Sequence, residues 1–354
     1  MRALRRPFAF FIAALLVLAG ALFLLPARNF TVEYGSLLSG LITKDPPAER
    51  PVLQNPFTGL PCEGEALPRP ISVMLAGDSV TRPLSGIAAA DLVVEMPVIT
   101  DGINRFLAVY VCPSGGPDAE IGSIRSARDD YLPLAAAFDA IYAHWGGSHF
   151  ALDALRGGTL DEIDALRNPY GAYFRKRGIT APHNGFTTLT RLRNTAVKLG
   201  YRMTLLEGFS SSAHGAAGEG APAFSVAIGY PGPYRVEWRY DDAQKRYLRW
   251  RGGSPEQDKV GDIQVTAGTL VAMRTTSRQI EGQYNDVRVT GSGEATVYRS
   301  GAMISGRWEK AATPLSAPLR FLDERGEPIS FSEGPVWIEI VQQDTIVETL
   351  NANL

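Results

Sequence analysis

The run ISVMLAGDSVTRPLSGIAAADLVVEMPVITDGINRFLAVYV, residues 71–111, contains three apolar segments of the kind that form buried strands. The segments ISVMLAGD, ADLVVEMPV and INRFLAVYV are rich in β-branched and aromatic residues, and glycine, proline and aspartate separate them. Helix patterns follow these strands. We therefore predict a mixed sheet flanked by helices, an α/β domain over residues 55–206.

Downstream of this run, strand and helix patterns alternate. The predicted strands are EIGSIRSAR (120–128) and DAIYAHW (139–145). The predicted helices are DDYLPLAAAF (129–138), HFALDALR (149–156) and TTLTRLRNTAVKLGY (187–201). Ser148 is the expected N-cap of the second helix, and Thr187 or Thr188 that of the third, which Gly200 should end.

The pattern changes after a glycine-, serine- and alanine-rich stretch at 207–222, which is typical of a linker. Residues 223–346 alternate polar and apolar side chains about turns such as Asp-Asp, GSG and SGA, and this predicts a mostly antiparallel β domain followed by a tail at 347–354. Aromatic stripes can bind sugars, but at strand spacing they more often form the core. The four tryptophans expected in the core are Trp238, Trp250, Trp308 and Trp337.

An uninterrupted apolar run from Phe8 to Leu25 follows three arginines at the N-terminus. In a helix it would span about 27 Å, close to the hydrocarbon thickness of a bilayer. The arginines place the N-terminus in the cytoplasm and the rest of the chain outside the cytoplasmic membrane. A cleaved signal peptide is the alternative, but the run is longer than usual and lacks a clean cleavage site. We expect a single-pass signal-anchor in residues 1–28 and a proline-rich tether in residues 29–54.

The composition narrows the function classes. The 354 residues carry 35 basic and 37 acidic side chains, a net charge of −2, so no nucleic-acid partner is expected. No glycine-rich phosphate loop, zinc-protease motif or serine nucleophile elbow is present. Cys62 and Cys112 would lie in an oxidising compartment, where they either pair or remain two small buried residues.

Charged residues gather at the ends of the predicted strands. Asp78 follows the first strand, Arg105 lies in another, and Arg125 and Arg128 precede a helix that begins at Asp129. Ligands collect at the carboxyl ends of strands in α/β sheets, and arginines and helix N-termini bind phosphate. We predict an anion site in which the arginines bind phosphate, with Asp78, Arg128 and Asp129 as the catalytic candidates. Asp78 and Asp129 could hold Mg²⁺ or act as a base.

Two loops offer further ligand-binding candidates. The turn before the second helix contributes His144, Gly146, Gly147 and Ser148. The sequence APHNGFTT contributes His183 and Asn184, after a basic loop with Arg175 and Lys176. Each group also has a structural alternative. Gly146 and Gly147 could form only a tight turn, and the basic loop could be only a solvated loop. Arg125 and Arg128 could pair with nearby acids on the surface.

The ordered motifs NPFTGLP, RPLSGIAAADLVVE, INRFLAVY, IGSIRSAR, YAHWGGS and APHNGFTT resemble the YerB-like family of bacterial lipoproteins. That family has an N-terminal and a C-terminal domain of unknown function, and the resemblance covers nearly all of residues 55–346. It implies an extracytoplasmic, membrane-attached bacterial protein and supplies no established activity. The lipid-attachment cysteine of a lipoprotein is absent here, so the resemblance leaves the helix as the anchor.

A shorter resemblance covers residues 71–156. The order MLAGDS, INRFLAVY, GSIRSARDD and YAHWGGSHFALDAL is similar to the LytR–CpsA–Psr phosphotransferases, which surround a polyprenyl pyrophosphate and transfer glycopolymers to the cell wall. The matching positions are Asp78, Arg105, Arg128 and Asp129, with Arg125 nearby. Phe106 stands where that family has an aspartate.

Two functions are therefore open for an envelope protein of this kind. The first is a phosphotransferase-like enzyme, or a degenerate one, that binds a lipid-linked pyrophosphate or a glycopolymer through the strand-end arginines and aspartates. The second is a non-catalytic scaffold or sensor that binds an envelope polymer or a protein partner. The missing acid after Arg105 favours the second, and the remaining charge cluster favours the first.

Overall fold

The computed structural model describes residues 52–99, 102–113, 116–209, 213–215, 220–282 and 284–351. The predicted anchor and most of the predicted tether lie outside these residues. Among the helices of these ranges, none has the length and apolar character needed to cross a membrane. Leu53 and Gln54, which the prediction placed in the tether, form β1 and pair with β2 (Pro61–Cys62).

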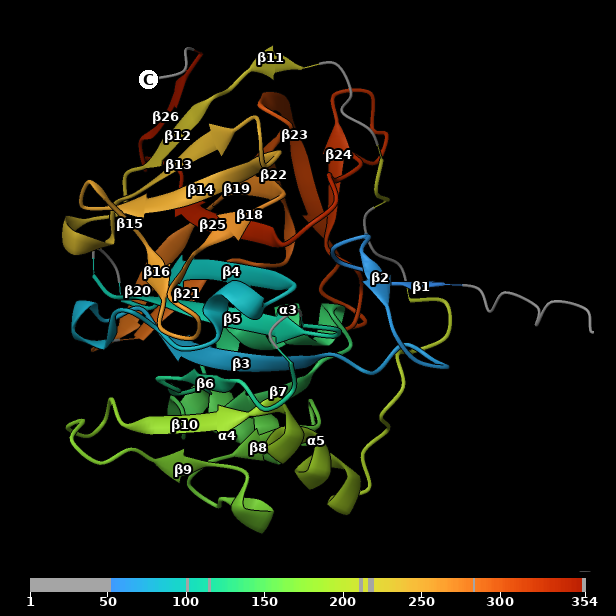
Figure 1. The fold of residues 1–354 in the computed structure, drawn as a ribbon, viewed down its shortest axis with the longest axis vertical. Helices are drawn as coiled ribbons and strands as arrows, with labels where there is room; N and C mark the ends of the chain where they lie inside the picture. Colours follow the sequence, from blue (N-terminus) through green and yellow to red (C-terminus); the bar gives the residue numbers. More distant parts are fainter. Residues whose placement is uncertain are drawn as a thin grey trace, which may run out of the picture. The chain divides into compact units, whose positions relative to one another are not determined.

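A mixed sheet of 11 strands runs through the molecule in the order β11-β23-β22-β19-β25-β4-β5-β3-β7-β8, with β24 paired to β23 (Figure 1). The first half of the chain supplies β3 (Ile71–Ala76), β4 (Leu92–Pro97), β5 (Asn104–Tyr110), β7 (Ile141–His144) and β8 (Glu162–Asp164). The second half supplies β11 (Ala221–Pro222), β19 (Thr269–Thr275), β22 (Gly291–Arg299), β23 (Ala302–Lys310), β24 (Arg320–Asp323) and β25 (Val336–Gln342).

The three strands predicted in residues 71–111 are confirmed as β3, β4 and β5. Every residue of β3 and β4 is buried. Apolar clusters cover both faces of the sheet, one containing Val73 and Phe106 and the other Met74 and Leu107. Both faces being covered explains why these strands read as continuous apolar runs rather than as an alternation.

The two halves of the chain meet inside this sheet. Strand β25 lies between β19 and β4 and is parallel to both, with Val336 opposite Leu92 and Glu339 opposite Glu95. Residues 52–354 accordingly form one compact unit. Of the predicted linker at 207–222, residues 210–212 and 216–219 lie outside the described part of the chain.

A second sheet, ordered β15-β14-β13-β12-β26 with β18 paired to β14, packs one face against the first. Its strands are β12 (Ser225–Ile228), β13 (Val236–Asp241), β14 (Arg246–Arg251), β15 (Ser254–Pro255), β18 (Thr266–Ala267) and β26 (Val347–Leu350). The predicted hairpin about Asp-Asp is confirmed as β13 and β14, and its inward residues, such as Trp238 and Tyr247, are buried between the sheets.

Shorter strands and helices complete the fold. The remaining strands are β6 (Glu120–Gly122), β9 (Phe174–Arg175), β10 (Gly185–Thr188), β16 (Gln257–Asp258), β17 (Ile263–Gln264), β20 (Ser277–Glu281) and β21 (Tyr284–Val287). The α-helices are α3 (Leu132–Ala137), α4 (His149–Arg156) and α5 (Leu189–Lys198). Short 3₁₀ turns are η1 (Ser79–Thr81), η2 (Ile87–Ala89), η3 (Asp129–Tyr131), η4 (Pro169–Gly171) and η5 (Gly232–Tyr234).

The predicted helix caps are confirmed. The Ser148 hydroxyl accepts a bond from Ala151 N at 3.1 Å, and Thr188 rather than Thr187 caps α5. Gly200 follows α5 with φ of +77°, a conformation that glycine adopts without strain.

Three sequence predictions need correction. The first half of the chain contains few helices, so the described fold is mostly β rather than evenly α/β. The predicted strand at 120–128 ends at Gly122, because the following residues leave β10 and enter the space beside β3. Residues 291–293, predicted as a turn, open β22.

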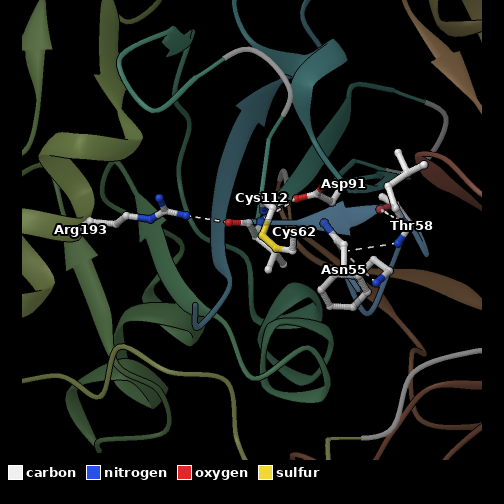
Figure 2. Close-up of a disulfide and its surroundings, with 9 residues drawn as sticks. Asn55, Thr58, Cys62, Asp91, Cys112 and Arg193 are labelled. Atoms are coloured by element: carbon white, nitrogen blue, oxygen red, sulfur yellow. Dashed lines mark hydrogen bonds between the residues drawn. A yellow bond between two sulfur atoms is a disulfide. The ribbon is translucent and has the colours of Figure 1, made fainter. Parts of the chain in front are cut away.

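A disulfide joins Cys62 of β2 to Cys112, just after β5 (Figure 2). Of the two alternatives, pairing is the one that the structure supports. The Asp91 carboxylate accepts bonds from Val111 N at 2.6 Å and Cys112 N at 3.2 Å, and burial raises its pKa to about 6. Arg193 donates to Val111 O at 2.7 Å. The β1–β2 hairpin is thereby fastened to the end of a central strand.

Candidate functional site

The candidate site forms where two central strands separate. Strands β3 and β7 pair in parallel over only three residues each. Beyond this point segment 123–128 lies between them. Arg125 N donates to Met74 O of β3 at 2.8 Å, and Ala127 N donates to Gly146 O of the loop after β7 at 2.8 Å. The backbone of this segment therefore fills the split and carries Arg125 and Arg128 to the strand ends.

Arg125 lies at the centre of a group of site residues that the sequence predicted. Its guanidinium donates to Asp78 Oδ2 from Nε at 3.2 Å and from Nη2 at 2.9 Å. Nη2 also lies 3.0 Å from His183 Nδ1, in the loop before β10. Asp78, Arg125 and His183 therefore converge from three separate parts of the chain, as the sequence predicted for the first two.

Two more arginines lie beside this group. Arg105 donates from Nη1 to Ser126 O at 2.9 Å, and Arg128 donates from Nη1 to Ala127 O at 2.9 Å. Within the described part of the chain, the Nε atoms of both are buried and have no hydrogen-bond partner. Arg128 is 5% exposed, and its guanidinium lies 5.1 Å from the ring centre of Tyr284, on β21.

The electrostatics identify an excess of positive charge here. Burial, together with the positive charges of Arg128 and Arg125, lowers the pKa of Arg105 to about 9. Burial also lowers the pKa of Arg128. We call Arg105, Arg125 and Arg128 the arginine cluster. Arg125 and Arg128 disfavour the charged form of Arg105, and a bound anion would favour it.

Asp129 and Asp130 lie beside Arg128 at the start of η3. Burial raises the pKa of Asp129, against a hydrogen bond with Ser148 that lowers it. Burial and the charge of Asp129 raise the pKa of Asp130 to about 8, so this carboxyl holds a proton at neutral pH. No group of three or more potential metal ligands occurs among the residues that the structure describes.

The polar contacts of His144 include carboxylates of β8. Its Nδ1 lies 2.8 Å from Gly146 O, and its Nε2 lies 3.3 Å from a carboxylate oxygen of Glu162. The ring is fully buried, and burial lowers its pKa. The structure thus places His144 in the packing between β7 and β8.

Gly146, Gly147 and Ser148 shape the turn into α4. Gly146 has φ of +61° and donates from its N–H to Asp164 Oδ1 at 2.8 Å. A Cβ atom on Gly147 would lie 3.1 Å from the Cβ of Ala127, so glycine permits segment 123–128 to approach. These residues hold the arginine-bearing segment in position.

Asn184 lies beside His183 but bonds elsewhere. Its Oδ1 accepts a hydrogen bond from Arg175 Nη1 at 2.6 Å. The Arg175 guanidinium lies 4.3 Å from the ring centre of Trp145, which is half-buried. The basic loop noted in the sequence therefore borders the site, and Trp145 is a neighbour that the sequence did not single out.

Sequence reasoning missed a buried ionic network between the two large sheets. Arg249 of β14 is fully buried and bonds Glu256 and Glu339 at 2.8 Å each, and also Glu95. Arg251 lies 3.0 Å from Glu256. The available signal was a single acid in each of two apolar strands, LVVEMP and VWIEIVQ.

The pKa shifts in this network follow from burial and pairing. Burial and the charge of Glu95 raise the pKa of Glu339 to about 7. Burial alone would raise the pKa of Glu256, but Arg249 and Arg251 outweigh it and hold the value at about 2. The indole N–H of Trp238 donates to Glu339 at 2.9 Å. Each charge of the network meets an opposite charge, so the network joins the sheets.

Fold and site together describe a β-rich protein with an arginine cluster at the split between two central strands. Residues 57–202 match the N-terminal domain, and residues 226–338 the C-terminal domain, of a protein of unknown function, DUF3048. The chain belongs to this family.

Two known proteins are similar to the chain over most of its length. The Bacillus subtilis (strain 168) protein named "Putative lipoprotein YerB" is 26% identical over 298 residues, which is 82% of this chain and 86% of that protein. The crystal structure of the YerB protein from Bacillus subtilis has a TM-score of 0.73 at 24% identity and covers 84% of this chain and 99% of that one. The YerB-like resemblance is confirmed. These matches give no support to the LytR–CpsA–Psr resemblance.

Proposed function

We propose that the protein is a membrane-attached, extracytoplasmic bacterial protein that binds a phosphate-bearing ligand at the arginine cluster. Three observations support the location. The similar Bacillus subtilis protein bears a lipoprotein name, Cys62 and Cys112 form a disulfide, and the sequence predicts an N-terminal anchor. Disulfides persist mainly in oxidising compartments outside the cytoplasm.

The observation that carries the binding proposal is the uncompensated charge. Three guanidinium groups share a partly buried site, and among the described residues their one ion pair joins Arg125 to Asp78. The buried Nε atoms of Arg105 and Arg128 lack partners within the described ranges. An unpaired buried donor costs free energy, so a site of this kind is suited to an anionic acceptor. Guanidinium groups bind phosphate oxygens in a planar, two-bond geometry.

Binding without catalysis is the simpler form of the proposal. A base needs a carboxylate directed at the ligand, whereas Asp78 Oδ2 already accepts two bonds from Arg125. A carboxylate held in this way orients the arginine. Mg²⁺ held by Asp78 and Asp129 stays a prediction, and comparing affinities with and without the ion tests it.

The proposed ligand class is a lipid-linked pyrophosphate, or a glycopolymer that carries phosphate. The test is isothermal titration of the full-length chain in neutral detergent with geranyl pyrophosphate, a short polyprenyl pyrophosphate, with and without Mg²⁺. We expect a Kd in the micromolar range, about −8 kcal/mol. Inorganic pyrophosphate in a parallel titration separates recognition of the headgroup from recognition of the lipid.

The matched variants are Arg128→Ala, inside the cluster, and Arg325→Ala, whose side chain is 88% exposed. Arg128→Ala should weaken binding at least tenfold while the thermal unfolding curve stays cooperative, and Arg325→Ala should bind as the parent does. Equal affinity for Arg128→Ala, or no binding by the parent chain to either pyrophosphate, would refute the proposal.

A further inference from the structure

The outward face of the second sheet contains a groove with a volume of about 1340 Å³. It follows β12. Val226 and Ile228 of this strand point into the core, so Ser225 and Ala227 face outward. Small side chains on a strand between two strands with larger ones leave a channel along it.

Larger side chains form the walls on both sides. Ala227 lies opposite Glu237 of β13 and opposite Glu348 of β26. On the far side of Glu237 is Trp250 of β14. The Arg239 guanidinium packs 4.1 Å from the Trp250 ring centre. Four strands therefore contribute to one continuous polar surface with an indole at one side.

Trp250 differs from the other tryptophans of this half of the chain. Trp238, Trp308 and Trp337 are at most 2% exposed, as the sequence predicted for core residues, whereas Trp250 is half-buried and lines the groove. Its Nε1 atom has no hydrogen-bond partner among the described residues. The prediction that all four form the core is therefore wrong for Trp250, because its strand position faces outward.

Two other lining residues have similarly unsatisfied atoms. Arg82 Nε and Gln257 Oε1 are buried and lack a partner in the described ranges. The remaining nitrogens of Arg82 donate to Pro233 O and Gly77 O at 2.9 Å each. The residues that line the groove therefore include unsatisfied donors and an unsatisfied acceptor, a combination that a hydroxyl group can satisfy from either side.

The charge of the groove distinguishes it from the arginine cluster. Three arginines and four carboxylates line it, and two of the arginines form ion pairs with lining carboxylates. Arg251 lies 3.0 Å from Glu256, and Arg235 lies 3.0 Å from Glu348. A lining with nearly equal numbers of positive and negative side chains has no large excess of either charge to attract a polyanion or a polycation, so it favours an uncharged ligand.

We infer that this groove binds an uncharged, hydroxyl-rich chain, a glycan segment of several sugars. Its volume exceeds the roughly 300–1,000 Å³ of small-molecule pockets, so an extended ligand fits better than a single small molecule. The indole supplies an apolar face for a sugar ring, and the unsatisfied atoms supply hydrogen bonds. This site is separate from the arginine cluster and does not depend on the proposed function.

The test is isothermal titration of the full-length chain in neutral detergent with a panel of uncharged hexasaccharides built from N-acetylglucosamine, glucose, mannose or galactose. We expect at least one to bind with a Kd below 1 mM. An uncharged ten-residue peptide of glycine, serine and threonine is titrated in parallel. Binding of the peptide alone, or of none of these probes at 10 mM, would overturn the inference.

Variants then locate the binding site. Trp250→Ala should weaken glycan binding at least tenfold, and Trp250→Phe, which keeps an aromatic face without the N–H, should lose less. Ala227→Trp places a bulky side chain on the floor and should also block binding, which separates loss of the ring from loss of the fold. Tyr170→Ala, at a residue 60% exposed outside the groove lining, is the matched control. If both Trp250→Ala and Ala227→Trp bind the glycan with the affinity of the parent chain, the groove is not the binding site.

Discussion

The arginine cluster and the Arg249 network both bury arginine side chains, but the hydrogen-bond partners of these arginines differ. Arg249 has a carboxylate for every nitrogen, supplied by Glu95, Glu256 and Glu339. Arg105 and Arg128 instead donate to backbone carbonyls, and their Nε atoms have no partner in the described part of the chain. Every guanidinium nitrogen of Arg249 meets a carboxylate, whereas the three arginines of the cluster have one ion pair among the described residues, that of Arg125 with Asp78.

This difference separates stability from binding. A buried arginine with complete pairing joins two sheets, and removing it leaves carboxylates without compensation. A buried arginine without an ion pair lowers the free energy of unfolding. A ligand that supplies the opposite charge removes this penalty. Burial alone therefore does not identify a functional arginine, whereas its partners do.

The largest expected effect comes from Arg249→Met, which removes the cation shared by the buried carboxylates and keeps a similar apolar length. Removing one partner of a buried ion pair costs about 3–5 kcal/mol, so the free energy of unfolding in urea should fall by about that amount. Arg325→Met, at an exposed arginine, should change it by less than about 0.5 kcal/mol. A loss below about 1 kcal/mol for Arg249→Met would show that the network does not hold the sheets together.

Arg105→Met makes the same arginine-to-methionine substitution in the arginine cluster. Because Arg125 and Arg128 repel Arg105, the free energy of unfolding should stay within about 1 kcal/mol of the parent value. The affinity for inorganic pyrophosphate should fall at least tenfold, about 1.4 kcal/mol. Urea denaturation and titration calorimetry measure the two quantities. If Arg105→Met lowers the free energy of unfolding as much as Arg249→Met does, Arg105 stabilises the fold as Arg249 does, and the contrast between the two regions is wrong.

A further expected effect is a pH dependence of the free energy of unfolding. Burial and Glu95 raise the pKa of Glu339 from 4.5 to about 7 in the folded protein. The folded state therefore binds this proton more tightly, and the associated stability is complete below pH 4.5 and lost as the pH rises through 7. The slope is at most about 1.4 kcal/mol per pH unit. Glu339→Gln should remove this decline between pH 5 and 8, and parallel curves for the two proteins would contradict it.

The local features of the fold could be predicted from the sequence. Strands β3, β4 and β5 and the helix caps Ser148 and Thr188 depend on near neighbours in the chain, and the patterns located them. The split between β3 and β7 could not be predicted, because segment 123–128 is placed by backbone bonds to residues about 20 to 60 positions away. Apolar periodicity carries no information about such partners.

The candidate site shows the same division. Strand-end position identified Asp78 and Arg125, which do meet, but it also selected His144, which faces β8. Side-chain direction at a strand end depends on the strands packed beside it.

The amino-acid sequence alone established the family, the central apolar strands and the concentration of charge at their ends, because these depend on composition and short-range order. Only the tertiary structure decided that β25 joins β4, which brings Glu339 beside Glu95, and that Arg249 is paired while Arg105 is not. The physical reason is that pairing and desolvation of a charge depend on residues distant in the chain, and packing determines which of them it meets.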